Sequence, residues 1–549
     1  MVQTGGMRDG DDEVPSQVQM SMLKGFDVSE ITIADLHCHY LKSDFTVEDY
    51  TAYCLQRIRT LNPYVEAVIE TNPDALSIAR DLDQQRASGS AIRRLHGIPV
   101  LVKDNIATKD SMQTTAGSWA LLGSIVPRDA FVVRRLREEG AVILGHANMS
   151  EWASVRSKAY STGYSPRGGQ VRNPFDLRKT PFGSSSGSAV AVSANLVPIS
   201  LGTETDTSII GPASIASVVG IKPTVGLTSR SGVIPISENL DSVGTFGRTV
   251  RDAVVGLDAL IGQDNDDPFT HHSRVAAPFM QHLAGRNALK GARFGLPIKR
   301  CWELCPPDCK AVAYEMLQFI RDAGATIVEV DLPSIEERIA PDGGWNWEHG
   351  DADKSEWTVV KVDAYNGINA YLNSLDQTPV RTIEDLIEYN KQNAGTEGPH
   401  PGELPAFSSG QDNFHEIIKT KGVKDVTYHS ALEHIQKQTR ENGIDAALSY
   451  TDPDTGARSE LDALIFCDRR GIGQQYAAQA GYPIICVPIG LDAKGMPVSL
   501  SLQHSAWREA ELVKWASAIE DLRNVTLGPR ATPRYRNLLA KNIPIERIA

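Results

Sequence analysis

Apolar residues follow a helical period in the first part of the chain. Between residues 46 and 62 the segment TVEDYTAYCLQRIRTLN places its apolar side chains on one stripe. Thr46 is the predicted N-cap of this helix, and Asn62-Pro63 is its predicted end. A second helix is expected in PDALSIARDLDQQRASG, which begins at Pro73.

Short apolar runs alternate with helical segments from residue 97 onward. The expected strands are GIPVLVKD, AVILGHAN, VPISLGTET, RFGLPI, TIVEVDLP, ALIFCD, PIICVPIG and PVSLSLQH. The expected helices are DAFVVRRLREEG, SAVAVSANL and the segments 308–323, 426–442 and 507–520. Continuous apolar strands between helices indicate an α/β fold: a large mixed, mostly parallel twisted β-sheet covered by helices on both faces.

The chain contains no repeat and no linker that would divide it into independent domains. Residues 27–549 are therefore expected to form a single domain, preceded by a disordered lead-in over 1–26. Residues 340–415 differ from the rest, since Trp345, Trp347 and Trp357 stand among Gly, Pro, Asp and Asn. This composition predicts an irregular insertion, either a lid or pocket wall or a solvated excursion.

Composition excludes several classes of function. The 549 residues carry a net charge of -13, and basic residues form only short pairs such as Arg134-Arg135, which disfavours nucleic acid as a partner. No apolar run approaches the roughly 20 residues of a membrane-spanning helix, and the N-terminus lacks the apolar core of a secretory signal. Seven cysteines without regular spacing fit a reducing compartment, so a cytoplasmic location is predicted.

Two local patterns are candidates for metal binding. Cys301, Cys305 and Cys309 would share one helix face at their spacing, but the two prolines at 306 and 307 predict a helix that begins only near residue 308. His37 and His39 have no third ligand nearby. No metal site is therefore predicted.

Lys103 ends the apolar strand GIPVLVKD. Burial penalises the charged form of a lysine and lowers its pKa, so a buried Lys103 could act as a neutral base. The alternative is a lysine whose ammonium reaches solvent at the sheet edge.

A serine-rich segment, PFGSSSGSAVAV, leads into the helix near residue 188. Ser184, Ser185 and Ser186 lie where unpaired N–H groups and the positive end of the helix dipole favour oxygen nucleophiles and anions. The segment also matches G-x-S-x-G with Ser185 at its apex, although no buried strand precedes it. A serine-rich helix cap is the alternative interpretation.

A third segment, TETDTSIIGPAS, joins a strand to a short helix that has Pro212 in its first turn. Ser208 is therefore expected on the connecting loop. Such a loop can turn successive N–H groups toward one point and hold an oxyanion. Taken alone, the segment is only a turn.

Together, these three segments resemble the amidase signature family, and the resemblance extends from about residue 28 to 525. LHGIPVLVKDNI is similar to the family's lysine strand, GSSSGSAVAV and LGTETDTSIIGPASIASVVG to its serine-rich signature, and AAQAGYPIICVPIG to its C-terminal part. By position, Lys103 matches the catalytic lysine, Ser184 the bridging serine that follows a cis peptide, and Ser208 the nucleophile. Gly183 and Ser185 match supporting positions. An Asp two residues before the nucleophile is similar to the peptide amidases.

The resemblance implies hydrolysis of a small-molecule or peptide amide without a cofactor or metal. Ser208 would attack the carbonyl carbon, and Lys103 would accept the proton through Ser184. The oxyanion would bind the backbone N–H groups of Thr205, Asp206, Thr207 and Ser208.

Two positions depart from the family pattern. Thr207 stands where the family usually has glycine before the nucleophile, and Phe182 stands where it commonly has glycine before Gly183. These departures leave open a degenerate relative that binds a ligand or acts as an interaction protein. Two further alternatives are an α/β-hydrolase-like esterase that uses Ser185 with a downstream Asp and a histidine such as His504, and an amidotransferase subunit. The oligomeric state is left open.

Overall fold

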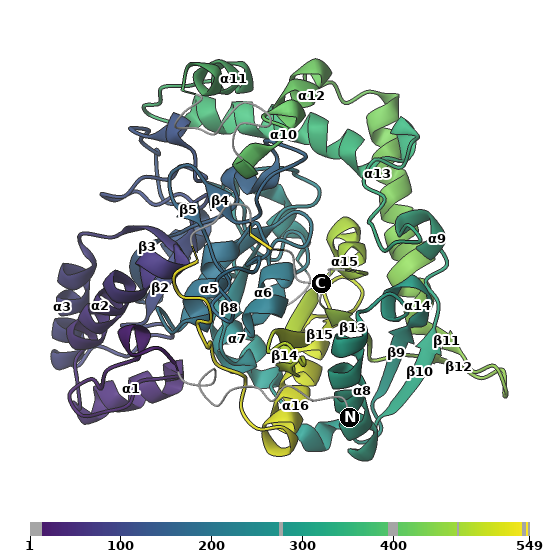
Figure 1. The fold of residues 1–549 in the computed structure, drawn as a ribbon, viewed down its shortest axis with the longest axis horizontal. Coiled ribbons are helices and arrows are strands. Elements are labelled where there is room, and N and C mark those ends of the chain that lie inside the picture. Colours follow the sequence, from purple (N-terminus) through teal and green to yellow (C-terminus); the bar gives the residue numbers. More distant parts are fainter. Residues whose placement is uncertain (1–13, 274–277, 394–404, 469–471, 541–544, 547–549) are drawn as a thin grey trace, which may run out of the picture.

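An eleven-stranded mixed sheet runs through the centre of the molecule (Figure 1). The computed structural model describes residues 14–273, 278–393, 405–468, 472–540 and 545–546. The strand order is β1-β3-β2-β6-β8-β7-β14-β15-β13-β9-β10. The strands are β1 (Val68–Thr71), β2 (Pro99–Lys103), β3 (Val142–Ala147), β6 (Ile199–Glu204), β7 (Val219–Lys222), β8 (Ser242–Gly247), β9 (Arg293–Pro297), β10 (Thr326–Val330), β13 (Ala463–Asp468), β14 (Ile484–Leu491) and β15 (Pro497–Gln503). Every strand expected from the apolar runs is present.

Parallel and antiparallel pairs occupy different parts of the sheet. β2 is parallel to β3 and β6, and β9 is parallel to β10 and β13. The other neighbouring strands are antiparallel, so parallel pairs are a smaller share than expected. Because β2 and β6 are parallel neighbours, their carboxyl ends meet at one edge of the sheet. This arrangement brings Lys103 beside the loop that follows β6.

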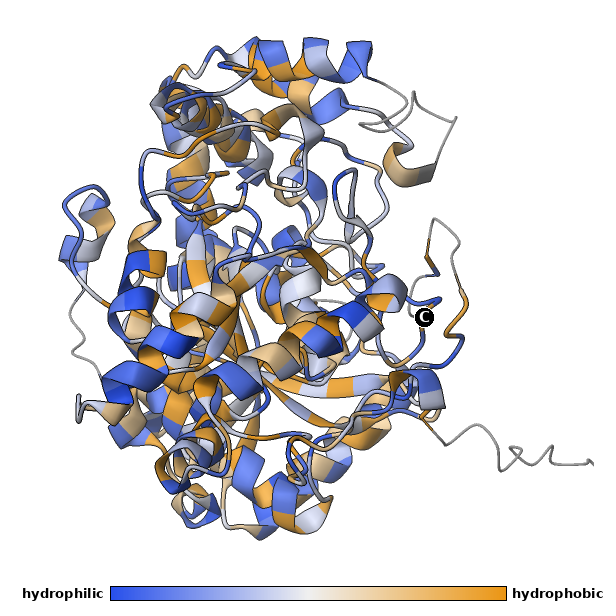
Figure 2. Ribbon diagram, turned by 90° about the vertical axis from the view of Figure 1, so that its left-hand side faces the viewer, coloured by the Kyte–Doolittle hydropathy of each residue, from blue (hydrophilic) through white to orange (hydrophobic). Residues whose placement is uncertain are grey.

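Helices cover both faces of the sheet, as the sequence predicts. On one face lie α7 (Val250–Leu260), α8 (Pro307–Asp322) and α16 (Glu509–Thr526), and on the other lie α5 (Ser186–Ser193) and α6 (Ile210–Ala216). Side chains of β14 alternate between the two apolar clusters: Ile485 and Val487 join one, and Ile484 and Cys486 the other. Figure 2 shows this arrangement as hydrophobic colour concentrated on the central strands.

The first long helix differs from its prediction at one end. α2 (Val47–Val65) begins after Thr46, which accepts a hydrogen bond from the N–H of Asp49 in a capping box, as expected. The predicted end at Asn62-Pro63 is wrong, since the helix runs through Pro63 to Val65. Near a helix terminus, proline removes a single hydrogen bond, and the N–H of Glu66 still bonds to Asn62 O at 2.8 Å.

The segment 340–415 is more regular than its composition suggests. It contains α10 (Glu356–Ser374) and α11 (Ile383–Gln392), and α12 (Asp412–Thr420) begins within it; all three lie at the top of Figure 1. The expectation of irregular backbone is wrong for these parts because α10 has a buried stripe at helical spacing: Trp357, Val360, Ala364, Ile368 and Leu372. Irregular backbone does occur over residues 340–351, and residues 394–404 lie outside the described part.

The disordered lead-in predicted for residues 1–26 lies partly outside the described residues, which begin at 14. Residues 14–26 are packed on the domain, because Val18 is fully buried and its carbonyl accepts a hydrogen bond from Arg57. The predicted lead-in is therefore too long at its C-terminal side. Among the described helices, none has both the length and the apolar character that crossing a membrane requires.

The two prolines at 306 and 307 separate the three cysteines, as predicted. α8 begins at Pro307, so Cys301 and Cys305 precede the helix and only Cys309 lies in it. Cys305 Sγ lies 2.9 Å from Cys467 Sγ on β13. The three cysteines therefore do not share a helix face.

Candidate active site

Lys103, Ser184 and Ser208 meet at the edge of the sheet; we call them the serine–lysine trio. Lys103 Nζ lies 2.8 Å from Ser184 Oγ, and Ser184 Oγ lies 3.0 Å from Ser208 Oγ. These two contacts form one continuous chain of hydrogen bonds across three segments distant in sequence. The structure thus brings together the three side chains that the sequence singled out.

Lys103 lies at the end of β2 with no exposed surface, so its ammonium does not reach solvent. Its Nζ also lies 2.8 Å from Thr203 Oγ1 and 3.1 Å from Thr203 O. Burial lowers the pKa of Lys103 from 10.5 to about 7, against a smaller raising effect of Asp241 and Glu204. Near neutral pH, both the neutral and the charged lysine are therefore populated.

Ser184 lies just before α5, and the peptide bond between Gly183 and Ser184 is cis. The N–H of Ser150 donates to Ser184 O at 3.1 Å. A Cβ on Gly183 would lie 2.6 Å from Ser150 Oγ, so only glycine fits beside this contact. These backbone contacts fix the direction in which Ser184 Oγ points.

The loop after β6 carries Ser208, whose residue surface is 9% exposed. Glu204 Oε2 accepts from the N–H groups of Ile209 and Ile210 at 2.6 and 2.9 Å, and thereby ties the loop to the start of α6. In the described part of the chain, no acceptor is found for the N–H groups of Asp206, Thr207 and Ser208. The predicted oxyanion-binding segment therefore has donors available.

Thr207 adopts a left-handed conformation with φ of 53°. A β-branched residue is strained there by about 1–3 kcal/mol, which explains why glycine is the usual residue. The loop nevertheless keeps Ser208 Oγ within reach of Ser184. Thr205, at the start of the loop, donates from Oγ1 to the half-buried Asp241 at 2.6 Å.

Ser185, the alternative nucleophile, makes hydrogen bonds that connect neighbouring segments of the backbone. Its Oγ donates to Thr203 O at 3.0 Å, and its N–H donates to Ser208 O at 3.1 Å, which joins α5 to β6 and to the loop. His504 accepts from the N–H of Ser505 at 2.8 Å, and burial lowers its pKa to about 4. The arrangement that an esterase would need from Ser185 and His504 is not formed.

Ser208 opens onto a pocket of about 1150 Å³. Three aromatic residues from the segment 345–357, which we call the tryptophan wall, line it: Trp345, Trp347 and Trp357. Phe182 also lines the pocket, and its ring packs against α6 so closely that a Cβ on Gly211 would lie 2.3 Å from a ring carbon. The aromatic group at 182 thus narrows the pocket next to Ser208.

Two carboxyl groups near the pocket, those of Asp206 and Glu356, have environments that the sequence did not predict. Asp206 lines the pocket, and its Oδ1 has no hydrogen-bond partner among the described residues. Burial raises the pKa of Asp206 well above its usual value, and Glu356 and Glu204 raise it further. Glu356 accepts from Trp345 Nε1 at 2.9 Å and from Gln479, and burial raises its pKa to about 7. Glu356 thus holds Trp345 of the tryptophan wall by a hydrogen bond, and its charge acts on Asp206 in the loop of Ser208.

Comparison with known proteins agrees with this geometry. The Amidase family model matches residues 49–388. The chain belongs to the amidase signature family. A Schizosaccharomyces pombe protein named as an amidase is 47% identical over 530 residues, covering 96% of this amidase and 90% of the yeast protein.

Solved structures show the same fold. The peptide amidase of Stenotrophomonas maltophilia matches with a TM-score of 0.80 and 37% identity, over 92% of this chain and 99% of that chain. A peptide amidase in complex with the competitive inhibitor chymostatin matches with the same score and identity. An amidase family protein from Bacillus anthracis matches with a TM-score of 0.78 and 30% identity, over 92% of each chain. The protein is a hydrolase that acts on amide C–N bonds.

Proposed function

We propose that this amidase hydrolyses linear carboxamides through an acyl-enzyme on Ser208, with Ser184 as a proton relay and Lys103 as the base. The observation that carries the proposal is the unbroken chain from Lys103 Nζ through Ser184 Oγ to Ser208 Oγ. An amide is a poor electrophile, so its hydrolysis requires an activated nucleophile and a proton for the departing amine. One buried chain of hydrogen bonds supplies both needs.

The proton moves along this chain in one direction and then returns. Neutral Lys103 accepts the proton of Ser184, and Ser184 accepts the proton of Ser208 as Ser208 Oγ bonds to the carbonyl carbon. The oxygen of the resulting tetrahedral intermediate accepts hydrogen bonds from the N–H groups of Thr205–Ser208. The same chain then delivers a proton to the nitrogen, the C–N bond breaks, and ammonia or an amine leaves.

Water completes the cycle. It attacks the ester carbon of the acyl-Ser208, and its proton passes through Ser184 to Lys103. The second tetrahedral intermediate collapses by breaking the bond to Ser208 Oγ, which regains a proton from the chain. The products are a carboxylic acid and the regenerated hydroxyl. A lysine with a pKa of about 7 suits both directions, since proton transfer is most efficient when that pKa lies near the working pH.

The pocket favours an amide with an apolar group. A volume of about 1150 Å³ exceeds the range of roughly 300–1,000 Å³ that is usual for small-molecule sites, so it has room for a peptide-sized ligand. The tryptophan wall offers aromatic surface for an apolar side chain. The structural neighbour that binds chymostatin is a peptide amidase. We therefore assign peptide C-terminal amides, or aryl and alkyl amides, as the substrate class.

Covalent labelling tests the nucleophile. A fluorophosphonate probe should label the parent at Ser208, and Ser208→Ala should lose both the label and the release of ammonia from a peptide amide. Ser193→Ala is the matched control, because Ser193 is a buried serine of α5 whose hydroxyl has no partner among the described residues. Labelling of folded Ser208→Ala at the parent level, or turnover unchanged in it, would overturn the proposal.

A further inference from the structure

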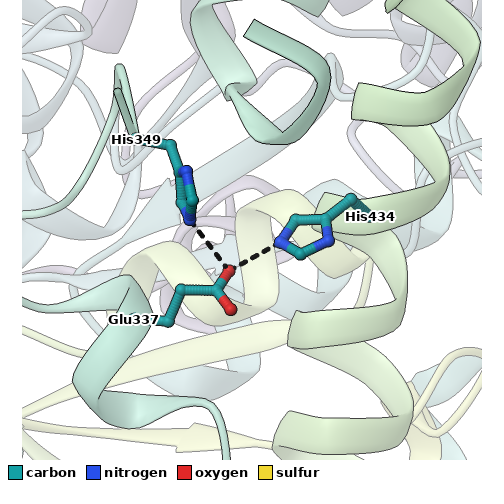
Figure 3. A group of neighbouring side chains, drawn as sticks. All are labelled: Glu337, His349 and His434. Carbon is teal, nitrogen blue, oxygen red and sulfur yellow. Dashed lines mark hydrogen bonds and ion pairs between the residues drawn. The ribbon is translucent and has the colours of Figure 1, made fainter. Parts of the chain in front are cut away.

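A second cluster of reactive side chains lies outside the active site, where three segments meet (Figure 3). Glu337 is on the short helix α9 (Ile335–Arg338), His349 on the loop that follows the tryptophan wall residue Trp347, and His434 on α13 (Val426–Thr439). Figure 3 shows the three side chains pointing toward one another. None of the three lines the pocket of Ser208.

The distances are those of a compact ligand set. His434 Nε2 lies 2.7 Å from Glu337 Oε1, and His349 Nε2 lies 3.5 Å from the same oxygen. One ligand atom from each residue lies within 4.8 Å of the others. An ion placed among them needs only small side-chain movements to reach ligand distances of about 2.0–2.2 Å.

The chemistry of the set is that of a transition-metal site. Two imidazoles and one carboxylate are a known donor set for Zn²⁺, which is completed by a water at the fourth position. The side chains are 12%, 20% and 30% exposed for His349, His434 and Glu337, so the site is sheltered but open to one water.

The surroundings contain two cations, Arg338 and Lys354, the second of which donates to Asp351 Oδ2 at 3.0 Å, and two ring or carboxylate atoms without a hydrogen-bond partner among the described residues. Arg338 Nη2 donates to Glu337 Oε1 at 2.7 Å, whereas no hydrogen bond in the described part of the chain uses Glu337 Oε2. That oxygen is therefore available to an ion while Oε1 keeps Arg338. His349 Nδ1 is buried without a partner among the described residues, and Asp351 Oδ2 lies 4.0 Å from it. A carboxylate behind a metal-binding imidazole is the usual partner that orients it.

The loop that carries His349 also forms part of the pocket. Residues 342–348 line the pocket, and Asn346 joins them to α9 through hydrogen bonds of 2.9 Å to the carbonyls of Glu337 and Arg338. The N–H of His349 donates to Asn346 Oδ1 at 3.1 Å. Whatever fixes His349 therefore fixes the loop that carries Trp345 and Trp347.

We propose that Glu337, His349 and His434 bind one divalent transition-metal ion of the zinc class, and that this ion holds the tryptophan wall against α9 and α13. The ion is structural or regulatory in this position, because its ligands do not reach the pocket. The inference stands apart from the proposed chemistry of Ser208. Binding of the ion changes the rigidity of the wall and leaves the serine–lysine trio in place.

Zn²⁺ titration of the full chain, stripped of metal with a chelator, tests the site by calorimetry. The parent should bind one equivalent, and His349→Ala and His434→Ala should each weaken binding by at least about tenfold. His429→Ala is the matched control, since His429 is an exposed residue of the same helix and should bind Zn²⁺ like the parent. Excess Zn²⁺ should raise the unfolding midpoint of the parent and of His429→Ala but not of the other two variants.

Folding of each variant is checked by circular dichroism and by fluorophosphonate labelling, and Glu337→Gln and His434→Gln replace any alanine variant that fails these checks. The site is overturned if the parent binds no stoichiometric Zn²⁺, or if the ligand variants bind as tightly as His429→Ala. Tryptophan fluorescence tests the second part. It should change when Zn²⁺ binds the parent, and a stoichiometric ion that leaves both fluorescence and KM unchanged would overturn the coupling to the wall.

Discussion

The serine–lysine trio and the tryptophan wall reach the same pocket from segments of different construction. The trio comes from the end of β2, the start of α5 and the loop after β6, and backbone contacts of the central sheet hold it. The wall comes from an irregular loop and the start of α10. Side-chain contacts hold much of it (Trp345 to Glu356, Trp357 to Glu416 and Lys158 to Glu348), beside a few backbone bonds such as Trp357 N–H to Trp347 O. Backbone pairing does not depend on which side chains are present, whereas side-chain contacts do.

The difference in construction fits two different requirements, those of proton transfer and of substrate selection. A proton relay works only when its atoms stay within hydrogen-bond distance, so it belongs on the most rigid part of the fold. A wall that selects among substrates can change residue by residue without disturbing that relay. The comparison predicts large losses of rate from changes in the trio and modest changes of KM from changes in the wall.

The largest effect is expected from Ser208→Ala. Removing the attacking oxygen should lower kcat/KM for a peptide amide by about 10⁴- to 10⁶-fold, since loss of a nucleophile removes the covalent route. Ammonia release under substrate excess measures the effect, and circular dichroism verifies the fold. A loss below about tenfold would show that another residue attacks the substrate.

A smaller loss, about 10²- to 10⁴-fold, is expected from Lys103→Met, which keeps the buried apolar length but removes the base. The dependence of kcat/KM on pH is a sharper test of the base than the size of this loss. In the proposed mechanism the neutral form of Lys103 is the active one, so kcat/KM of the parent should rise about tenfold per pH unit below its pKa of about 7 and level off above it.

Other buried acids near the pocket could also titrate in this range, and Glu356, with a pKa of about 7, provides the matched control. The rise with pH should persist in Glu356→Gln and vanish in the residual activity of Lys103→Met. The opposite result would show that Glu356, and not Lys103, is the group whose titration controls the rate.

The ring of Phe182 lines the pocket beside the trio and packs against Gly211 of α6. Gly211→Ala should lower the free energy of unfolding by about 1–3 kcal/mol, because the added Cβ meets the ring. Urea denaturation of Gly211→Ala, Phe182→Ala and the double variant measures the coupling. The cost of Gly211→Ala should nearly disappear when Phe182 is alanine, and equal costs in both backgrounds would contradict the contact.

The smallest effect is expected from Trp347→Ala. For an amide with an apolar side chain, KM should rise about threefold to tenfold, which corresponds to roughly 1 kcal/mol, while kcat changes little. Trp119→Ala is the control, because Trp119 is 37% exposed and does not line the pocket. A fall in kcat as large as that of Lys103→Met would show that the wall takes part in the relay.

Much of the fold could be predicted from the sequence because the strands of the sheet are local apolar runs. β2, β3, β6 and β15 lie within predicted segments and β14 ends one residue beyond its own, since a strand buried on both faces needs apolar residues throughout. The end of α2 at Val65, beyond Pro63, and the existence of α10 could not be predicted in the same way. The last turn of α2 accommodates Pro63, and in α10 tryptophans and polar residues surround a helical stripe that includes Ile368.

Within the site, Lys103, Ser184 and Ser208 could be singled out because each stands in a recognisable local segment. Asp206 stands in the signature segment, but its proximity to Glu356 could not be predicted, since 150 residues separate them and Glu356 has no local pattern. The same holds for Glu337, His349 and His434, whose spacing matches no ligand motif. Their proximity arises only when α9, the loop after it and α13 pack together.

The sequence by itself determined the buried strands, the serine-rich start of α5 and the identity of the groups able to carry a proton. Those properties depend on neighbours along the chain, through side-chain period, turn chemistry and helix capping. The tertiary structure alone decided that Lys103 loses its water and acquires a pKa of about 7, and that aromatic residues some 140 residues beyond Ser208 close around it. Desolvation and pocket shape are set by contacts between distant segments, which no local pattern encodes.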